Sequence, residues 1–153
     1  MLCGINPSLW SGVVGYHFAR PSNRLWPTLH LAGFTPRRLH PSETEALLAA
    51  GLGVTNLVPR ATARADELSR NELLAGPARV EGVARAWAPA FVAFLGLSAY
   101  RVAFSRPKAG VGLQPETLGP SRIWLLPNPS GLNASYQLPD LVAAYAELRA
   151  AAF

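Results

Sequence analysis

The sequence predicts an α/β fold in which helices cover both faces of a mostly parallel sheet. Apolar runs with strand-forming residues alternate along the chain with segments of helical spacing. Two of these runs end in an Asn-Pro turn, one at Asn6 and one at Asn128. Of the 153 residues, 50% are hydrophobic and 15% are charged. This balance fits one globular domain over residues 1–153 with a substantial core.

Four apolar runs have the composition of buried strands, because they combine branched aliphatic or aromatic side chains with flanking turn residues. In chain order they cover residues 1–5, 53–58, 89–95 and 122–126. The Gly- and Pro-rich residues 105–119 predict a loop or an edge hairpin. A chain rarely begins inside a core strand, and residues missing before Met1 are one explanation for this start.

Five segments between these runs have the spacing of amphipathic helices. They cover residues 25–33, 41–50, 69–87, 98–104 and 139–152. Gly33 and Gly51 are typical C-terminal stops for the first two. Residues 6–24 form a long loop, and its aromatic side chains argue against disorder.

The starts of two predicted helices carry capping signals. Ser42 with Glu45, and Ser69 with Glu72, have the spacing of a capping box. Gly76-Pro77 lies within the third helix, where it predicts an interruption because proline lacks a backbone donor.

Several classes of site are absent from the sequence. The single cysteine, Cys3, excludes an internal disulfide and a cysteine-cluster metal site, and we expect it to be a buried core thiol. No phosphate-loop or dinucleotide motif is present. His17, His30 and His40 lack metal-ligand spacing, so neither metal nor cofactor is expected. His30 and His40 fit a helix surface or loop, whereas His17 fits a ligand pocket.

Charge and hydropathy bear on the partner and the location. The net charge is +5, and the basic residues are thirteen arginines and Lys108. Arginine suits bidentate phosphate contacts, so this balance favours a polyanionic partner. A coding bias toward arginine, with solvated helix faces at Arg79, Arg85 and Arg149, is the alternative. No apolar run reaches the roughly 18 residues of a membrane span, and no secretory pattern opens the chain, so we expect a cytoplasmic protein without a membrane partner.

The two Asn-Pro turns are the main functional signal. Ligands of open α/β sheets bind at the carboxyl ends of the strands, so Asn6 and Asn128 are expected to line one cleft. The surrounding residue types are amides, hydroxyls and aromatic rings with no paired carboxylates, which suits a flat heterocycle better than a charged metabolite. They are Asn6, Asn128, Asn133, Ser8, Ser11, Ser130, Trp10, Tyr16 and Phe18. Asn-Pro as an ordinary turn initiator, with asparagine capping its own turn, remains the alternative.

Asn6 cannot serve as a general base, because an amide carries no negative charge at neutral pH, but it can orient a water molecule. That role suits a reaction in which the leaving group departs largely before water attacks. A missing general base forfeits about 10²–10⁴-fold in rate, so such an enzyme is expected to be slow.

These segments resemble the mismatch-specific uracil-DNA glycosylases and the thymine-DNA glycosylases. The similarity covers essentially the whole chain, and the two motifs at its ends are specific only together. The matching segments are Gly4-Ile5-Asn6-Pro7, residues 15–26, 32–34 and 53–58, and Asn128-Pro129-Ser130-Gly131-Leu132-Asn133.

The resemblance implies a three-layer α/β/α uracil-DNA glycosylase fold and a monomer without cofactor or metal. Its substrate would be uracil, or a related damaged base such as ethenocytosine, flipped out of double-stranded DNA and classically opposite guanine. Asn6 would position the hydrolytic water, and Leu132 would wedge into the duplex. The base pocket would comprise Ile5, His17, Phe18 and Asn128, and the contacts to the widowed guanine Ser130, Gly131 and Asn133.

Three positions depart from the family pattern. Ser8 stands where many relatives have glycine, and Asn133-Ala134 where close bacterial relatives often have Ser-Arg. Asp66 follows the second predicted strand and its loop, where a relative can have asparagine. Its carboxylate could activate water or stabilise positive charge on the sugar. The alternative is a helix cap or an acid at a helix N-terminus.

We therefore expect a monofunctional DNA glycosylase that removes uracil from DNA by base flipping and so initiates base excision repair. A non-catalytic module that binds damaged or mismatched DNA on the same fold is the alternative. A third possibility is an α/β hydrolase that acts on free nucleosides. Leu132 and the arginine-rich balance favour duplex DNA over nucleosides.

Overall fold

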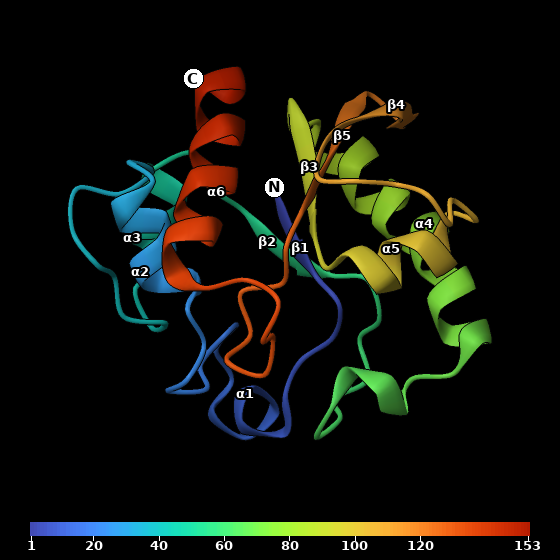
Figure 1. Cartoon of the computed structure of the whole chain (residues 1–153), viewed down its shortest axis with the longest axis horizontal. Coiled ribbons are helices and arrows are strands. Elements are labelled where there is room, and N and C mark those ends of the chain that lie inside the picture. The colour runs from blue at the N-terminus through green and yellow to red at the C-terminus, as the bar shows by residue number, and fades with distance from the viewer.

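A five-stranded sheet runs through the middle of the computed structural model, which describes residues 1–153 (Figure 1). The strand order is β2-β1-β3-β5-β4. The first four of these strands are mutually parallel, and β4 pairs antiparallel with β5 as an edge hairpin. The strands are β1 (Leu2–Gly4), β2 (Val54–Asn56), β3 (Phe91–Leu95), β4 (Gly112–Leu118) and β5 (Ser121–Leu126). All four predicted strands are confirmed, and residues 105–119 contribute the hairpin strand.

Helices cover both faces of this sheet, which confirms the predicted three-layer α/β/α architecture (Figure 1). One face is covered by α2 (Leu25–Leu31), α3 (Thr44–Ala49) and α6 (Leu138–Ala152), and the other by α4 (Arg70–Trp87) and α5 (Leu97–Ala103). The short helices α1 (Leu9–Val14) and η1 (Ala65–Glu67) lie among the loops below the sheet. None of the helices is both long and apolar enough to cross a membrane.

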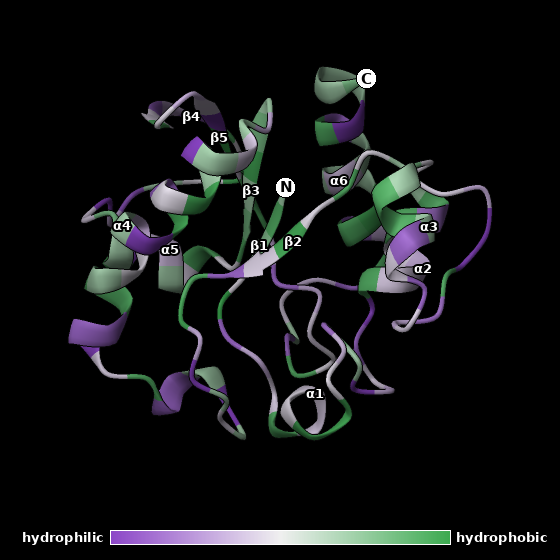
Figure 2. Cartoon of the chain, turned by 180° about the vertical axis from the view of Figure 1, so that it is seen from behind, coloured by the Kyte–Doolittle hydropathy of each residue, from purple (hydrophilic) through white to green (hydrophobic).

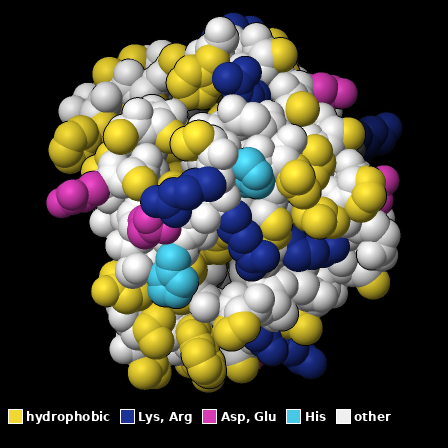
Figure 3. Space-filling view, turned by 90° about the vertical axis from the view of Figure 1, so that its left-hand side faces the viewer, with side chains coloured by type: hydrophobic (Ala, Val, Ile, Leu, Met, Phe, Trp, Pro, Cys, Tyr) yellow, Lys and Arg dark blue, Asp and Glu magenta, His cyan; other side chains and the backbone are white.

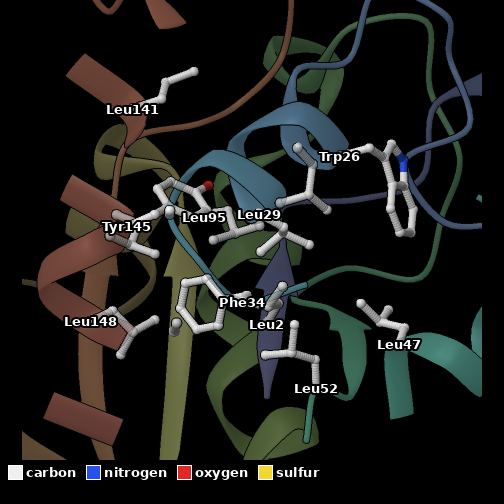
Figure 4. Packing of buried hydrophobic residues seen from close by; sticks show 14 of the residues in the cluster. Leu2, Trp26, Leu29, Phe34, Leu47, Leu52, Leu95, Leu141, Tyr145 and Leu148 are labelled. Atoms are coloured by element: carbon white, nitrogen blue, oxygen red, sulfur yellow. The ribbon is translucent and has the colours of Figure 1, made fainter. Parts of the chain in front are cut away.

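Alternation along the central strands builds two separate cores. In β3, Phe91, Ala93 and Leu95 face the first helix layer, and Val92 and Phe94 face the second. This is the period of two that a strand buried on both faces requires. Figure 4 shows the first core, where leucines of the sheet and its neighbouring segments meet side chains of α2 and α6. The sheet is therefore anchored from both sides.

The predicted long loop of residues 6–24 is wrong in one part, because it contains α1. Ser8 caps this helix by accepting a hydrogen bond from Ser11 N at 3.0 Å, and Gly15 ends it in the left-handed conformation. Both capping residues are visible in the sequence. The helix is only 6 residues long, too short for a periodic pattern to reveal.

Two predictions about helix ends and breaks are also wrong. The capping box at Ser42 does not form, because α3 begins at Thr44 and the Glu43 carboxylate accepts from His40 N at 2.7 Å instead. Helix α4 runs without interruption through Pro77. Its following turns are buried against the sheet, and this packing outweighs the loss of one helical hydrogen bond. The capping box of Ser69 and Glu72 is confirmed.

The parallel strands end at one edge of the sheet, and three long connections gather there. Figure 1 shows residues 5–24, 57–69 and 127–137 side by side below the strands, and the three segments line a common cavity. Seen from behind, the strands are largely hydrophobic while the connections below them are mixed or hydrophilic (Figure 2). The fold thus places the polar parts of the chain where a ligand can reach them.

Cys3 lies on β1 and is 1% exposed, as predicted for a core thiol. Burial raises its pKa to about 12, so almost no thiolate forms at neutral or mildly basic pH. We predict that the native protein does not react with a thiol-specific chromogenic disulfide at pH 8 and that one equivalent reacts after unfolding in urea. Rapid stoichiometric labelling of the native protein would contradict this placement of Cys3.

Candidate active site

A cavity of about 100 Å³ opens at the carboxyl edge of the sheet. Pockets for drug-sized ligands usually measure about 300–1,000 Å³, so this one is on the scale of a single ring. Both Asn6 and Asn128 line it, which confirms that the two Asn-Pro strand ends share one cleft. A third asparagine, Asn56, ends the edge strand β2 and lines the same cavity. Three parallel strands therefore each deliver an asparagine to one site.

Asn6 is held in a single orientation by its amide nitrogen. Its Nδ2 donates to Arg60 O at 2.8 Å and to Thr62 Oγ1 at 2.7 Å. Because a backbone carbonyl can only accept, the nitrogen must occupy this position. Oδ1 has no hydrogen-bond partner within the protein and is left for a ligand or water in the cavity. Thr62 is itself buried and donates to Arg64 O at 2.6 Å, so a further hydrogen bond fixes the hydroxyl that accepts from Asn6.

Asn56 is a site residue that the sequence interpretation missed, although a polar amide inside the apolar run 53–58 was a usable signal. It is buried, and Arg79 donates to its carbonyl oxygen. Its Nδ2 lies 3.4 Å from His17 Nδ1, a contact in which a neutral imidazole accepts. His17 is exposed at the cavity mouth, yet the atoms packed around its ring lower its pKa through desolvation. His17 therefore enters the site as a neutral ring.

Phe18 occupies a strained position beside the cavity. Its φ of 50° lies in the left-handed region, which is costly for an aromatic residue. Ala19 N donates to Ser11 Oγ at 3.1 Å, and Trp26 Nε1 donates to Phe18 O at 3.0 Å, so both polar groups of the peptide bond that follows Phe18 are hydrogen-bonded. A Cβ on Gly4 would lie 2.9 Å from the Phe18 ring, so only glycine at the end of β1 lets the ring pack there.

Residues 127–137 contribute a third segment to the cavity lining. We call them the wedge loop, after the role expected for Leu132. Leu132 at its tip is 60% exposed. Turn hydrogen bonds shape the loop, since Asn128 Oδ1 accepts from Ser130 N at 2.9 Å and Asn133 Nδ2 donates to Asn128 O at 2.9 Å. A Cβ on Gly131 would lie 2.6 Å from Ser22 O, so the loop packs directly on the neighbouring segment.

Not every candidate residue lines the cavity. Phe18 is the aromatic ring at its wall, whereas Trp10 and Tyr16 project from the surface elsewhere. Gly131 and Asn133 also lie outside its lining, and the Asn133 side chain is used within the wedge loop.

The site is more basic than the sequence interpretation suggested. Arg20 and Arg64, both exposed, line the cavity, so it is not neutral. Neither arginine belongs to an Asn-Pro turn, and only the folding of residues 20 and 64 toward the sheet edge brings them to the cavity. Figure 3, which views the molecule from the side of α2 and α3, shows basic side chains near the middle of that face with acidic and histidine side chains beside them. The described side chains form no cluster of three or more potential metal ligands.

Asp66 lies on η1, next to this cavity but outside its lining. Its carboxylate is exposed and accepts from Arg64 Nε at 3.1 Å. It borders an adjoining hollow that shares Ile5, Arg64 and Leu132 with the cavity. Asp66 therefore lines the adjoining hollow, directly after Arg64 and Ala65, which line both, in the first turn of a short helix.

The arrangement can bind one flat ring and offer it an aromatic face, an amide oxygen and neutral polar groups, with two arginines at the entrance. It can orient water through Asn6, but no side chain in contact with that amide is a base.

A family model described as Uracil DNA glycosylase superfamily matches residues 1–149. Because this match spans nearly the entire chain, the chain belongs to the uracil DNA glycosylase superfamily.

Proposed function

We propose that the protein is a monofunctional DNA glycosylase that hydrolyses the N-glycosidic bond of uracil in double-stranded DNA, with G·U mismatches as its preferred sites. The observation that carries this proposal is the oriented Asn6 amide, whose oxygen has no partner within the protein, in a residue that lines a ring-sized cavity together with Phe18. Membership of the superfamily supports the same reaction class. The released abasic site would be the starting point of base excision repair.

The chemistry follows from the groups in the cavity. The bond between C1′ and the base nitrogen breaks first, and its electron pair leaves with the uracil anion. A water molecule held by Asn6 Oδ1 then attacks the positively charged sugar carbon, and its surplus proton passes to solvent or to the departing base. Because Asn6 positions this water without accepting its proton, we expect slow turnover.

Base recognition in this proposal relies on the walls of the cavity. Phe18 would stack on the flipped base, with Ile5 as an apolar wall and Asn128 and the neutral His17 as polar neighbours. The cavity volume of about 100 Å³ is compatible with a pyrimidine ring. Related damaged pyrimidines would enter the same space.

The wedge loop would act on the duplex. The exposed Leu132 would fill the gap left by the flipped nucleotide, and the polar wedge-loop residues Ser130, Gly131 and Asn133 would face the unpaired guanine. Flipping costs a few kcal/mol and least at a mismatch, which would supply part of the selectivity. Arg20 and Arg64 would contact phosphates beside the flipped nucleotide.

We further propose that Asp66 contributes charge at the rim of the site. In the free protein Arg64 neutralises its carboxylate. A DNA phosphate would compete for Arg64 and release the carboxylate toward the sugar, where negative charge stabilises the developing cation. Its contribution should be smaller than that of Asn6, because Asp66 lies outside the cavity.

The primary test is the formation of abasic sites on a G·U duplex at enzyme excess, followed by alkaline strand cleavage. Cleavage at uracil, with none on a matched G·C duplex, is the expected result. If the protein binds the G·U duplex but produces no abasic sites after long incubation, the proposed glycosylase activity is wrong. The result would then favour a non-catalytic module that binds damaged or mismatched DNA.

We predict that Asn6→Ala lowers the single-turnover rate on G·U DNA by about 10²-fold, because the water loses its anchor. Thr62→Val should lower it less, since Arg60 O still holds the amide. Asn71→Ala, an exposed asparagine on α4, is the matched control and should keep the wild-type rate. Similar rates for Asn6→Ala and the control would remove Asn6 from the mechanism.

For Asp66 we predict a loss of about tenfold in Asp66→Asn, measured in single turnover with DNA in saturating protein. The exposed Glu147 on α6 offers Glu147→Gln as a charge-matched control with unchanged rate. Wild-type rates for Asp66→Asn and Asp66→Ala, both alone and combined with Asn6→Ala, would leave Asp66 a structural role only.

Leu132→Ala should slow processing of duplex DNA about tenfold while sparing a single-stranded uracil oligonucleotide, because only the duplex needs a wedge. Leu48→Ala is the control, since Leu48 is similarly exposed at 65% but lies on α3. Equal losses on both substrates would argue against a wedge.

A further inference from the structure

Arg24, the residue that precedes α2, holds the wedge loop through its guanidinium. Nη1 donates to Tyr136 O at 2.6 Å, and Nη2 donates to Ser130 O at 2.7 Å and to Asn133 O at 3.0 Å. The Arg24 backbone N–H donates to Pro129 O at 2.9 Å. One half-buried side chain therefore contacts the beginning, the tip and the end of the same loop.

The partners of Arg24 differ from those of the ion-paired arginines. Five arginines pair with carboxylates, whereas Arg24 binds backbone carbonyls alone. A rigid guanidinium presents five donors in fixed directions, which a lysine ammonium cannot reproduce. The contact is therefore specific for the path of the loop backbone and independent of its side chains.

The wedge loop has few other ties to the rest of the protein. Most of its remaining hydrogen bonds join residues within it, as at Asn128 and Asn133. Tyr145 donates to Pro127 O at 3.2 Å near its start, and Gly131 packs against Ser22. Without Arg24, the stretch that carries Leu132 would keep its local turns but lose its main attachment.

The same segment also holds the base cavity. Asn23 lines the cavity, and Trp26 on α2 donates to the carbonyl of the strained Phe18. Arg24 lies between these two residues in the chain. The first turn of α2 thus fixes the stacking ring on one side and the loop of Leu132 on the other.

We propose that Arg24 is a positioning residue for duplex recognition, which holds Leu132 in place before DNA binds and so sets the preference for duplex over single-stranded substrate. The proposal rests on the glycosylase function proposed above. Its physical basis is that a pre-ordered loop loses less conformational entropy when it enters the duplex. A single-stranded substrate needs no wedge, so its cleavage depends on the cavity, including Asn128 near the start of the loop, and not on the position of Leu132.

The test compares single-turnover rates on a G·U duplex and on a single-stranded oligonucleotide that contains one uracil. Arg24→Lys is expected to lower the duplex rate at least about tenfold and the single-strand rate less than about threefold. Arg149→Lys is the matched control, because Arg149 Nε also donates to a carbonyl, Gly33 O at 2.5 Å, far from the site. It should leave the ratio of the two rates unchanged.

Two further variants keep the test decisive. Gly131→Ala displaces the wedge loop through Ser22 while Arg24 stays in place, so it should reproduce the selective loss on duplex even if Arg24→Lys does not fold. In a Leu132→Ala background, Arg24→Lys should not change the duplex-to-single-strand ratio further, because both residues act through one wedge.

An unchanged ratio in folded Arg24→Lys, or a further change in the Leu132→Ala background, would overturn the proposal for Arg24. If Arg24→Lys does not fold, an unchanged ratio in Gly131→Ala would overturn it. A wild-type protein that cleaves neither substrate would instead overturn the proposed glycosylase function. These outcomes are distinct, because the first requires active wild-type enzyme and the second its absence.

Discussion

The direction of the strands is the constraint on which the rest of the structure depends. Because β1, β2 and β5 are parallel, residues that follow them in the chain meet at one edge of the sheet, although they are far apart in sequence. Asn6, Asn56 and Asn128 reach the same cavity for this reason alone. The two apolar cores hold the sheet from both faces, so this edge gives a fixed attachment to the loops that extend from it.

The site uses packing to hold groups that would not adopt their positions alone. Phe18 keeps a left-handed backbone because two hydrogen bonds hold the peptide group that follows it. Its ring packs against Gly4, where a Cβ would collide with it. Asn6 keeps one amide orientation because both acceptors of its nitrogen belong to the segment after β2. Strain of this kind persists where surrounding structure over-determines a residue, which is common in binding sites.

Electrostatics divides the site into two zones. Apart from Arg20 and Arg64, the residues that line the cavity are uncharged, including His17, whose desolvated ring has a lowered pKa. At the rim are Arg20, Arg64 and Asp66, all exposed to solvent. A neutral interior suits an uncharged base, and an exposed basic rim suits its phosphates, so the two zones match the two parts of a nucleotide.

Sequence patterns were enough to predict the four parallel strands, the covered sheet and the meeting of the two Asn-Pro turns, because apolar runs and strand-end turns are local patterns. Helix α1 and the unbroken α4 were missed, since a six-residue helix has no visible period and tertiary packing overrides Pro77. Only the tertiary structure showed the roles of Asn56 and Arg24. Their contacts, to His17 and to the wedge loop, join segments 39 and more than 100 residues apart, and such pairings depend on how the layers pack.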